Sequence, residues 1–324
     1  MPQISMQYAV TRVKAMGHKM LGQAAMERLA GAEDLDEAIR LLSDSGIPAE
    51  SRREAEEAAE ALVKDACAAI RELTPLPQIT DCFLYKYDGL NLKSLLKARS
   101  LGRTDVALSS CGTVDADVMR HAVAEASYRT LPDFLRRAAE EMDKANAESF
   151  DPLKTDACID KAVYARINAN LQGRKNEDVR EYFQADADLT NLMMVLRAHA
   201  IGWTGEDCRD MLVPGGTLDE KTLMACCDDP VACKKAVKGK KWAKAVPSLL
   251  KDTISLPLLE KEADDYKMRL LKEHRHDVTG ILPLIGYLIA RERESMAIRL
   301  ILTAKSARVP KETLMERLRE AYVR

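Results

Sequence analysis

Residues able to do chemistry are thinly spread along this 324-residue chain. There are eight cysteines and five histidines, and the only cysteine cluster is Cys226–Cys227 with Cys233. No CxxC spacing occurs, although structural zinc sites usually rely on it to place two sulfurs on one metal. His274 and His276 are two residues apart, so a helix would point them to different sides. We therefore predict packed or surface thiols, solvated histidines on a helix surface, and no metal site.

Three carboxylates are candidates for acid/base chemistry. Asp88, Asp188 and Glu294 recur along the chain and could be read as an acid/base set. Helix N-capping is the simpler account of the two aspartates, because a carboxylate there accepts orphan backbone N–H groups. Asn91 and Asn191 follow three residues later, where asparagine is a mediocre choice for a first helical turn. We expect them to bond across repeated units, to a partner, or to the local backbone.

The remaining motifs of catalysis and ligand binding are missing. The sequence contains no GxxxxGK[ST] phosphate loop, no GxGxxG after a strand and no HExxH. A basic run at 234–244 holds six lysines and Trp242, and it is either a contact for acidic lipid, nucleic acid or an acidic partner, or a solvated loop or helix end. The net charge of -2 gives nucleic acid little support. We predict no cofactor, no small-molecule substrate and no nucleic acid. An enzyme using buried carboxylates or a thiol such as Cys226 is a rival interpretation.

The composition favours an all-α protein. Hydrophobic residues make up 47% of the chain, aromatic residues only 5%, and strong helix formers dominate. Alternating β-branched stretches are hard to find. The start of the chain has no apolar core typical of a secretory signal, and the apolar stretch 280–290 is too short to span a bilayer. We expect a soluble chain with reduced thiols.

A segment of the chain occurs twice, a hundred residues apart. "DGLNLKSLLKARSLG" at 88–102 matches "DLTNLMMVLRAHAIG" at 188–202. The match continues downstream, since "CGTVDADVM" at 111–119 resembles "GGTLDEKTL" at 215–223. Two linked matches in the same order indicate a repeated structural unit.

A third, fainter copy starts at Glu294, which takes the place of the aspartate, while Ala297 replaces the asparagine. "VPKETLMERL" at 309–318 then stands where the "GT" segments stood. The pattern predicts three helical subdomains, at 1–120, 121–224 and 225–324.

Each copy carries its own start and stop signals. Gly102 and Gly202 are expected to end their helices, and Thr217 with Glu220 forms a T-x-x-E capping box for the next helix. Ser51 is expected to cap a helix over 51–73.

The repeated Asp-x-x-Asn-Leu helix followed by "PGGTL" resembles the C subunit of the archaeal/bacterial V/A-type ATPase (ATP synthase), the counterpart of the d subunit of the eukaryotic V-ATPase. Tyr8 and Arg12 are similar to the opening Tyr–Arg helix of that family, and Glu294 with Arg299 resembles its C-terminal helix. The resemblance covers nearly the whole chain. Ala297 and His199 depart from the asparagine and the Lys or Arg that are common in the family at these positions.

This resemblance implies a funnel of three helical subdomains with pseudo-threefold symmetry. It implies a non-catalytic subunit attached peripherally to the cytoplasmic face of the membrane. There it would join the rotor shaft of the central stalk to the membrane proteolipid ring and transmit torque. The expected polar funnel or inter-helix contacts are Asp88, Asn91, Asp188, Asn191, Arg197 and Glu294. The alternative is an α-helical repeat scaffold for other protein partners.

Overall fold

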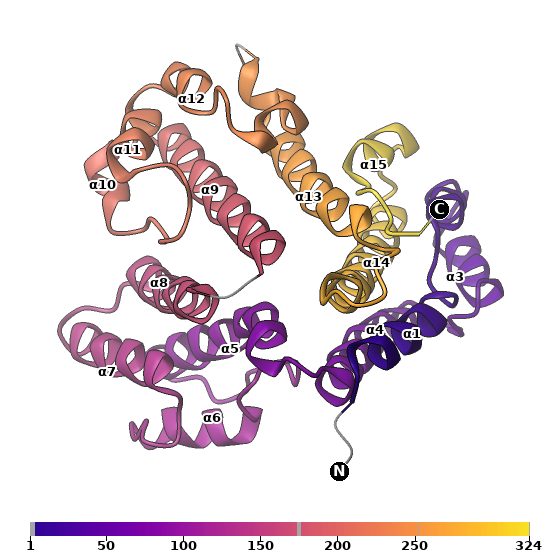
Figure 1. Cartoon of the computed structure of the whole chain (residues 1–324), viewed down its shortest axis with the longest axis horizontal. Coiled ribbons are helices and arrows are strands. Elements are labelled where there is room, and N and C mark those ends of the chain that lie inside the picture. Colours follow the sequence, from indigo (N-terminus) through magenta and orange to yellow (C-terminus); the bar gives the residue numbers. More distant parts are fainter. Residues whose placement is uncertain (1–3, 174–175, 252, 324) are drawn as a thin grey trace. The chain divides into compact units, whose positions relative to one another are not determined.

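The computed structural model describes residues 4–173, 176–251 and 253–323, and every regular element in these ranges is helical (Figure 1). The α-helices are α1 (Met6–Gly17), α2 (Gln23–Ala30), α3 (Leu35–Asp44), α4 (Arg52–Leu73), α5 (Pro77–Ser100), α6 (Ala116–Ala124), α7 (Asp133–Glu148), α8 (Pro152–Leu171), α9 (Glu177–Ala200), α10 (Gly205–Arg209), α11 (Glu220–Asp228), α12 (Pro230–Ala236), α13 (Leu256–Glu273), α14 (Leu282–Ser306) and α15 (Lys311–Arg317). Two short 3-10 helices are η1 (Lys241–Ala245) and η2 (Pro247–Leu250). The all-α prediction is confirmed.

The chain divides into two compact units. Unit 1 comprises Met1–Pro77, Ala245–Ser248 and Thr253–Arg324, and unit 2 comprises Gln78–Lys244 and Leu249–Asp252. The division into subdomains at 1–120, 121–224 and 225–324 stays a prediction. The funnel with pseudo-threefold symmetry is consistent with the helical content and also stays a prediction.

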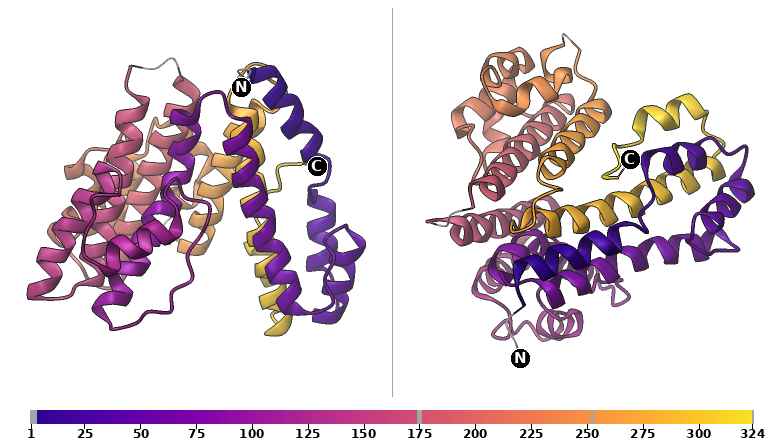
Figure 2. Two further views of the ribbon diagram at one scale, coloured as in Figure 1. Left: turned by 90° about the horizontal axis from the view of Figure 1, so that it is seen from below. Right: turned by 45° about the vertical axis from the view of Figure 1, so that its right-hand side comes forward.

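Unit 1 joins the two ends of the chain around one apolar core. Helix α14 lies alongside α4, as Figure 2 shows. Leu29 and Leu42 from the N-terminal helices pack in the same core as Ile298 and Leu302 from α14. Burying each such side chain stabilises the fold by roughly 1.5–3 kcal/mol before chain entropy is counted. The core therefore holds segments together that are more than two hundred residues apart in sequence.

One apolar core of unit 2 is formed by α5, α6, α7 and α8. Gly89 allows α5 to approach α8 closely, because a Cβ at this position would lie 3.0 Å from Cγ2 of Val163. About two turns further along α5, Lys97 forms an ion pair with Asp156 of α8 at 2.8 Å. A separate aromatic cluster links α5 to α9, with the ring of Phe83 4.6 Å from that of Phe183. These contacts fix the lengthwise position of α5 against its neighbours.

The predicted helix ends are confirmed at three positions. Gly102 and Gly202 adopt left-handed φ values of 67° and 83°, which suit glycine. Ser51 accepts a hydrogen bond from the backbone N–H of Glu54 and so caps α4. At the end of α14, Arg308 takes the same left-handed conformation, with φ 53°. The third copy thus ends as the first two do, without the glycine.

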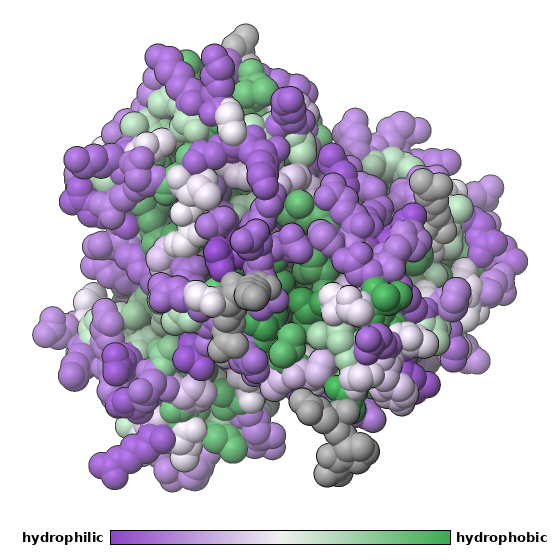
Figure 3. Space-filling view, in the orientation of Figure 1, coloured by the Kyte–Doolittle hydropathy of each residue, from purple (hydrophilic) through white to green (hydrophobic). Residues whose placement is uncertain are grey.

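The surface agrees with a chain in which 31% of residues are charged: hydrophilic residues dominate the face shown in Figure 3. Within the described ranges, no helix combines the length and apolar character needed to cross a membrane.

Candidate functional site

Asp88 lies in the middle of α5 and not at its N-terminus. The helix begins eleven residues earlier, at Pro77, so the predicted N-cap is wrong. The carboxylate is fully buried; it accepts the hydroxyl of Thr113 at 2.6 Å and the backbone N–H of Val114 at 2.9 Å. Asp88 therefore caps the loop that leads into α6, a distant segment, and not its own helix.

Asn91 holds an earlier part of the same loop, one turn of α5 further on. Its side-chain amide donates to the carbonyl of Ser109 at 2.8 Å, and its carbonyl oxygen accepts from the N–H of Ser109 at 2.8 Å. The side chain thus satisfies both backbone polar groups of one residue, as a neighbouring strand would. We call the buried carboxylate with the loop that it binds a clamp, and in this copy Asn91 adds a second attachment to the same loop.

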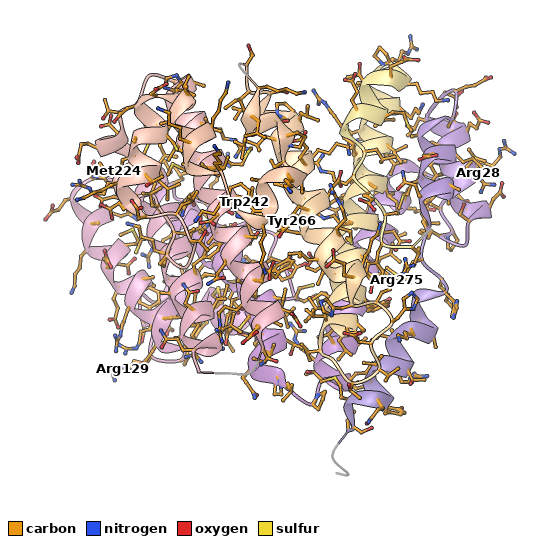
Figure 4. The ribbon with its side chains drawn as sticks, turned by 45° about the horizontal axis from the view of Figure 1, so that its top comes forward. Arg28, Arg129, Met224, Trp242, Tyr266 and Arg275 are labelled. Atoms are coloured by element: carbon orange, nitrogen blue, oxygen red, sulfur yellow. The ribbon has the colours of Figure 1, made fainter. Side chains whose placement is uncertain are left out.

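The second copy forms the same clamp. Asp188 lies mid-helix in α9 and accepts the hydroxyl of Thr217 at 2.6 Å, with the N–H groups of Thr217 and Leu218 at 2.7 and 2.9 Å. Asn191 binds the backbone of Val213 through both amide atoms, at 2.8 and 2.9 Å. Trp242, labelled in Figure 4, adds an indole donor 3.3 Å from Asp188.

This geometry corrects two further expectations in the second copy. Asp188 is not an N-cap, because α9 starts at Glu177. Thr217 and Glu220 do not form a capping box, because α11 starts at Glu220 and Asp219 caps it by accepting from Thr222 N–H. The Thr217 hydroxyl is used by the buried aspartate instead.

The third clamp takes its loop from the other end of the chain. Glu294 of α14 accepts the backbone N–H of Leu21 at 2.9 Å. Leu21 lies two residues before α2, just as Val114 lies two before α6 and Leu218 two before α11. We predicted that residues 309–318 would take the role of the "GT" segments, but for the hydrogen bond to the carboxylate this prediction is wrong. The N-terminal segment occupies that place.

Glu294 also pairs with a buried cation. Arg291 Nη1 lies 2.6 Å from Glu294 Oε2, and both side chains are less than a tenth exposed. Burial raises the pKa of the Glu294 carboxyl, while the charge of Arg291 and the N–H of Leu21 act in the opposite direction. The side chain of Ala297 has no polar atom with which to bind the loop as Asn91 and Asn191 do, and Arg291 pairs with the carboxylate of Glu294 instead of with the loop.

A second repeated contact was missed at the sequence level. Eleven residues after each carboxylate a basic side chain reaches a carbonyl near the end of the short helix that follows the clamp. Arg99 donates to Val123 O at 2.7 Å and Lys305 to Ala32 O at 2.5 Å. His199 Nδ1 lies 2.7 Å from Cys227 O, so this departure from the family pattern keeps the contact. The matched spacing of basic residues was the available signal, and a basic group suits a helix C-terminus.

Of the six predicted site residues, five belong to the clamps. Asp88, Asn91, Asp188, Asn191 and Glu294 are all buried and hydrogen-bonded. Arg197 lies exposed on α9. The five side chains make contacts between a helix and a loop. Their expected role as polar funnel or inter-helix contacts stays a prediction.

The cysteine and histidine candidates for chemistry lie in the core and in a turn. Cys226 is fully buried; its hydrogen bond with Cys233 lowers the pKa of its thiol, which burial opposes. The His274–His276 segment begins at the C-cap of α13 and continues in a turn, not on a helix surface. Within the described residues, no group of three His, Cys, Asp or Glu side chains is placed to hold a metal.

One groove of about 970 Å³ lies in unit 2 between α7, α8 and α10. Its floor is apolar, with Phe134, Met142 and Met211, and its rim is charged. No clamp residue lines it, so the repeated residues and the groove are separate features.

Comparison with known proteins finds relatives that match most of this chain. The model of a family described as "ATP synthase (C/AC39) subunit" matches residues 9–317. The C subunit of the V-type sodium ATPase of Enterococcus hirae is 24% identical over 256 residues, 78% of each chain. The C subunit of the A-type ATP synthase of Thermococcus onnurineus is 24% identical over 91% of this chain and 84% of its own. That of Methanosarcina mazei is 21% identical over 96% and 92%.

Proposed function

Because the chain belongs to the ATP synthase (C/AC39) subunit family, we propose that it is the non-catalytic central-stalk subunit of a rotary V/A-type ATPase. In this role it joins the rotor shaft to the membrane proteolipid ring on the cytoplasmic face and transmits torque for proton or sodium transport. The observation that carries the proposal is the family match over residues 9–317.

The clamps support a mechanical role. A torque-bearing adaptor must not deform between its two partners, and close-packed interiors with satisfied buried polar groups transmit strain well. Each clamp fixes a loop to the middle of a long helix through a buried carboxylate. The loops, usually the most mobile parts of a helical protein, are thereby tied to the helices.

Because the clamp residues are buried, exposed residues of the repeated helices make the contact with the shaft. Leu101 and Ile201 occupy equivalent positions at the ends of α5 and α9 and are 62% and 69% exposed. These exposed apolar side chains, with the exposed Arg197 four residues before Ile201, are suited to a protein interface, whose core is apolar and enriched in arginine.

Binding to purified shaft and ring tests this function. Native mass spectrometry should find one copy of the chain bound to both the shaft subunits and the detergent-solubilised ring. The double variant Leu101→Asp/Ile201→Asp should weaken shaft binding at least about tenfold, as loss of interface anchors does. Leu153→Asp is the matched control, since Leu153 is 50% exposed but lies on α8. If the folded chain binds neither partner, the scaffold alternative takes its place.

A further inference from the structure

The lysine segment, residues 230–244, is the most one-sided charge cluster that the proposed function leaves unused. It holds six lysines and no aspartate, glutamate or arginine, in a chain whose net charge is -2. It covers α12 and the turn and 3-10 helix that follow, at the end of the main stretch of unit 2 (Figure 1).

Some of the lysines also make contacts within the fold. Lys240 donates to Thr217 O and Oγ1, and so supports the loop of the second clamp. Lys241 pairs with Glu181 at 2.7 Å, yet 77% of its side chain stays exposed. Lys235, Lys238 and Lys244 are exposed as well. The acidic groups that contact or face the segment include Glu181 and Asp178 beside Lys241, Asp229, which caps α12, and the buried Asp188 beneath Trp242. The six lysines outnumber these groups.

The chemistry of the segment separates three kinds of anionic partner. Single-stranded nucleic acid stacks its bases on aromatic rings, and the only aromatic residue here, Trp242, is buried against Asp188. Fitted protein interfaces favour arginine and exposed aromatic residues, and the segment has neither. Lysines are hydrated point charges on flexible stems, which suit a diffuse anionic surface.

From this pattern we infer that the lysine segment is a docking surface for the anionic headgroups of a lipid bilayer. Clusters of four to eight basic residues are attracted to acidic lipids without fixed geometry. Val231, which is 56% exposed at the start of α12, adds an apolar side chain that can enter the interfacial region. This attraction does not depend on contacts with a shaft or ring.

Vesicle co-sedimentation of the full chain tests the inference. The chain should bind vesicles of phosphatidylcholine containing phosphatidylglycerol and should not bind phosphatidylcholine alone. Binding should disappear near 1 M salt, where the Debye length is about 3 Å. The triple variant Lys235→Gln/Lys238→Gln/Lys244→Gln should bind at least about tenfold more weakly, because each lysine near an anionic surface contributes roughly a factor of five.

A matched triple variant controls for net charge. Lys86, Lys144 and Lys154 are exposed lysines of the same unit outside the segment, and their change to glutamine should leave binding within about twofold. Equal losses in both triples would show a non-specific charge effect and overturn the inference. Absence of vesicle binding would also overturn it. If the segment triple then lost binding only to the purified ring, the partner would be an acidic protein surface.

Discussion

The carboxylate of Glu294 accepts a hydrogen bond from the backbone N–H of Leu21, at 2.9 Å and across 273 residues of sequence. The same relationship joins Asp88 to Val114 and Asp188 to Leu218, but there the two partners are 26 and 30 residues apart. In the first two copies one short stretch of chain joins the helix to the loop that its carboxylate binds. In the third copy the helix lies near the C-terminus and the loop near the N-terminus. Gln23 N–H donates to Val323 O nearby, so the C-terminal segment meets the same region.

Glu294→Ala should destabilise the fold by about 3–5 kcal/mol, because it leaves Arg291 buried and unpaired and the N–H of Leu21 without its acceptor. Glu294→Gln should cost less, since an amide oxygen can still accept from Leu21. Urea unfolding followed by circular dichroism measures both. Glu316→Ala, an exposed change on α15, should stay within about 0.5 kcal/mol. Equal small effects for Glu294→Ala and Glu316→Ala would contradict the clamp.

Asp188→Ala should destabilise by about 2–4 kcal/mol, since each buried donor left without an acceptor costs roughly 1–3 kcal/mol. The lost partners include the N–H groups of Thr217 and Leu218 and the indole of Trp242. Tryptophan fluorescence should also shift. Asp219→Ala removes an ordinary exposed helix cap and should cost only about 1 kcal/mol. A stable Asp188→Ala protein that lost shaft binding would make Asp188 a partner contact instead.

Gly112→Ala and Gly216→Ala should each destabilise by about 1–3 kcal/mol through overpacking. A Cβ at these positions would lie 2.2 Å from Oδ1 of Asp88 and 2.3 Å from Oδ1 of Asp188, so the carboxylate must move out of its clamp. Gly17→Ala is the control, because its nearest neighbour would be Met20 Sδ at 3.7 Å. The midpoint temperatures of thermal unfolding of the three glycine variants measure these effects. If the clamp is the cause, Gly216→Ala should cost much less in an Asp188→Ala background.

The acid sensitivity of unit 1 should depend on Asp264. Burial acts to raise the pKa of this carboxyl, but a bidentate pair with Arg293 at 2.6 Å and the charges of Lys267 and Arg319 lower it well below its ordinary value. A depressed pKa contributes stability above the unfolded value of about 3.9, and that contribution is lost as the pH falls toward the folded pKa.

Asp264→Asn should therefore be less stable than the parent chain at pH 7, and the gap should narrow below about pH 4. Urea unfolding at a series of pH values gives the difference directly. A gap that stays constant between neutral and acid pH would mean that the pKa of Asp264 is not depressed by its ion pairs.

The helical class, the repeat and several helix ends could all be predicted from the amino-acid sequence. Helix propensity, the Ser51 cap and the stops at Gly102 and Gly202 are local signals, and they were correct because they depend on neighbouring residues alone. The periodic match also picked out five residues that share one structural role.

The role of those five residues depends on the tertiary structure. An aspartate in the middle of a helix and one at an N-cap look alike in sequence. Distant segments that bury the side chain and supply its N–H donors decide which role the residue has. Asp88 and Asp188 lie eleven residues inside their helices, and backbone N–H groups of distant loops reach their carboxylates there. The pairing of Glu294 with Leu21 has no local signal at all, since packing of α2 against α14 brings the two ends of the chain together.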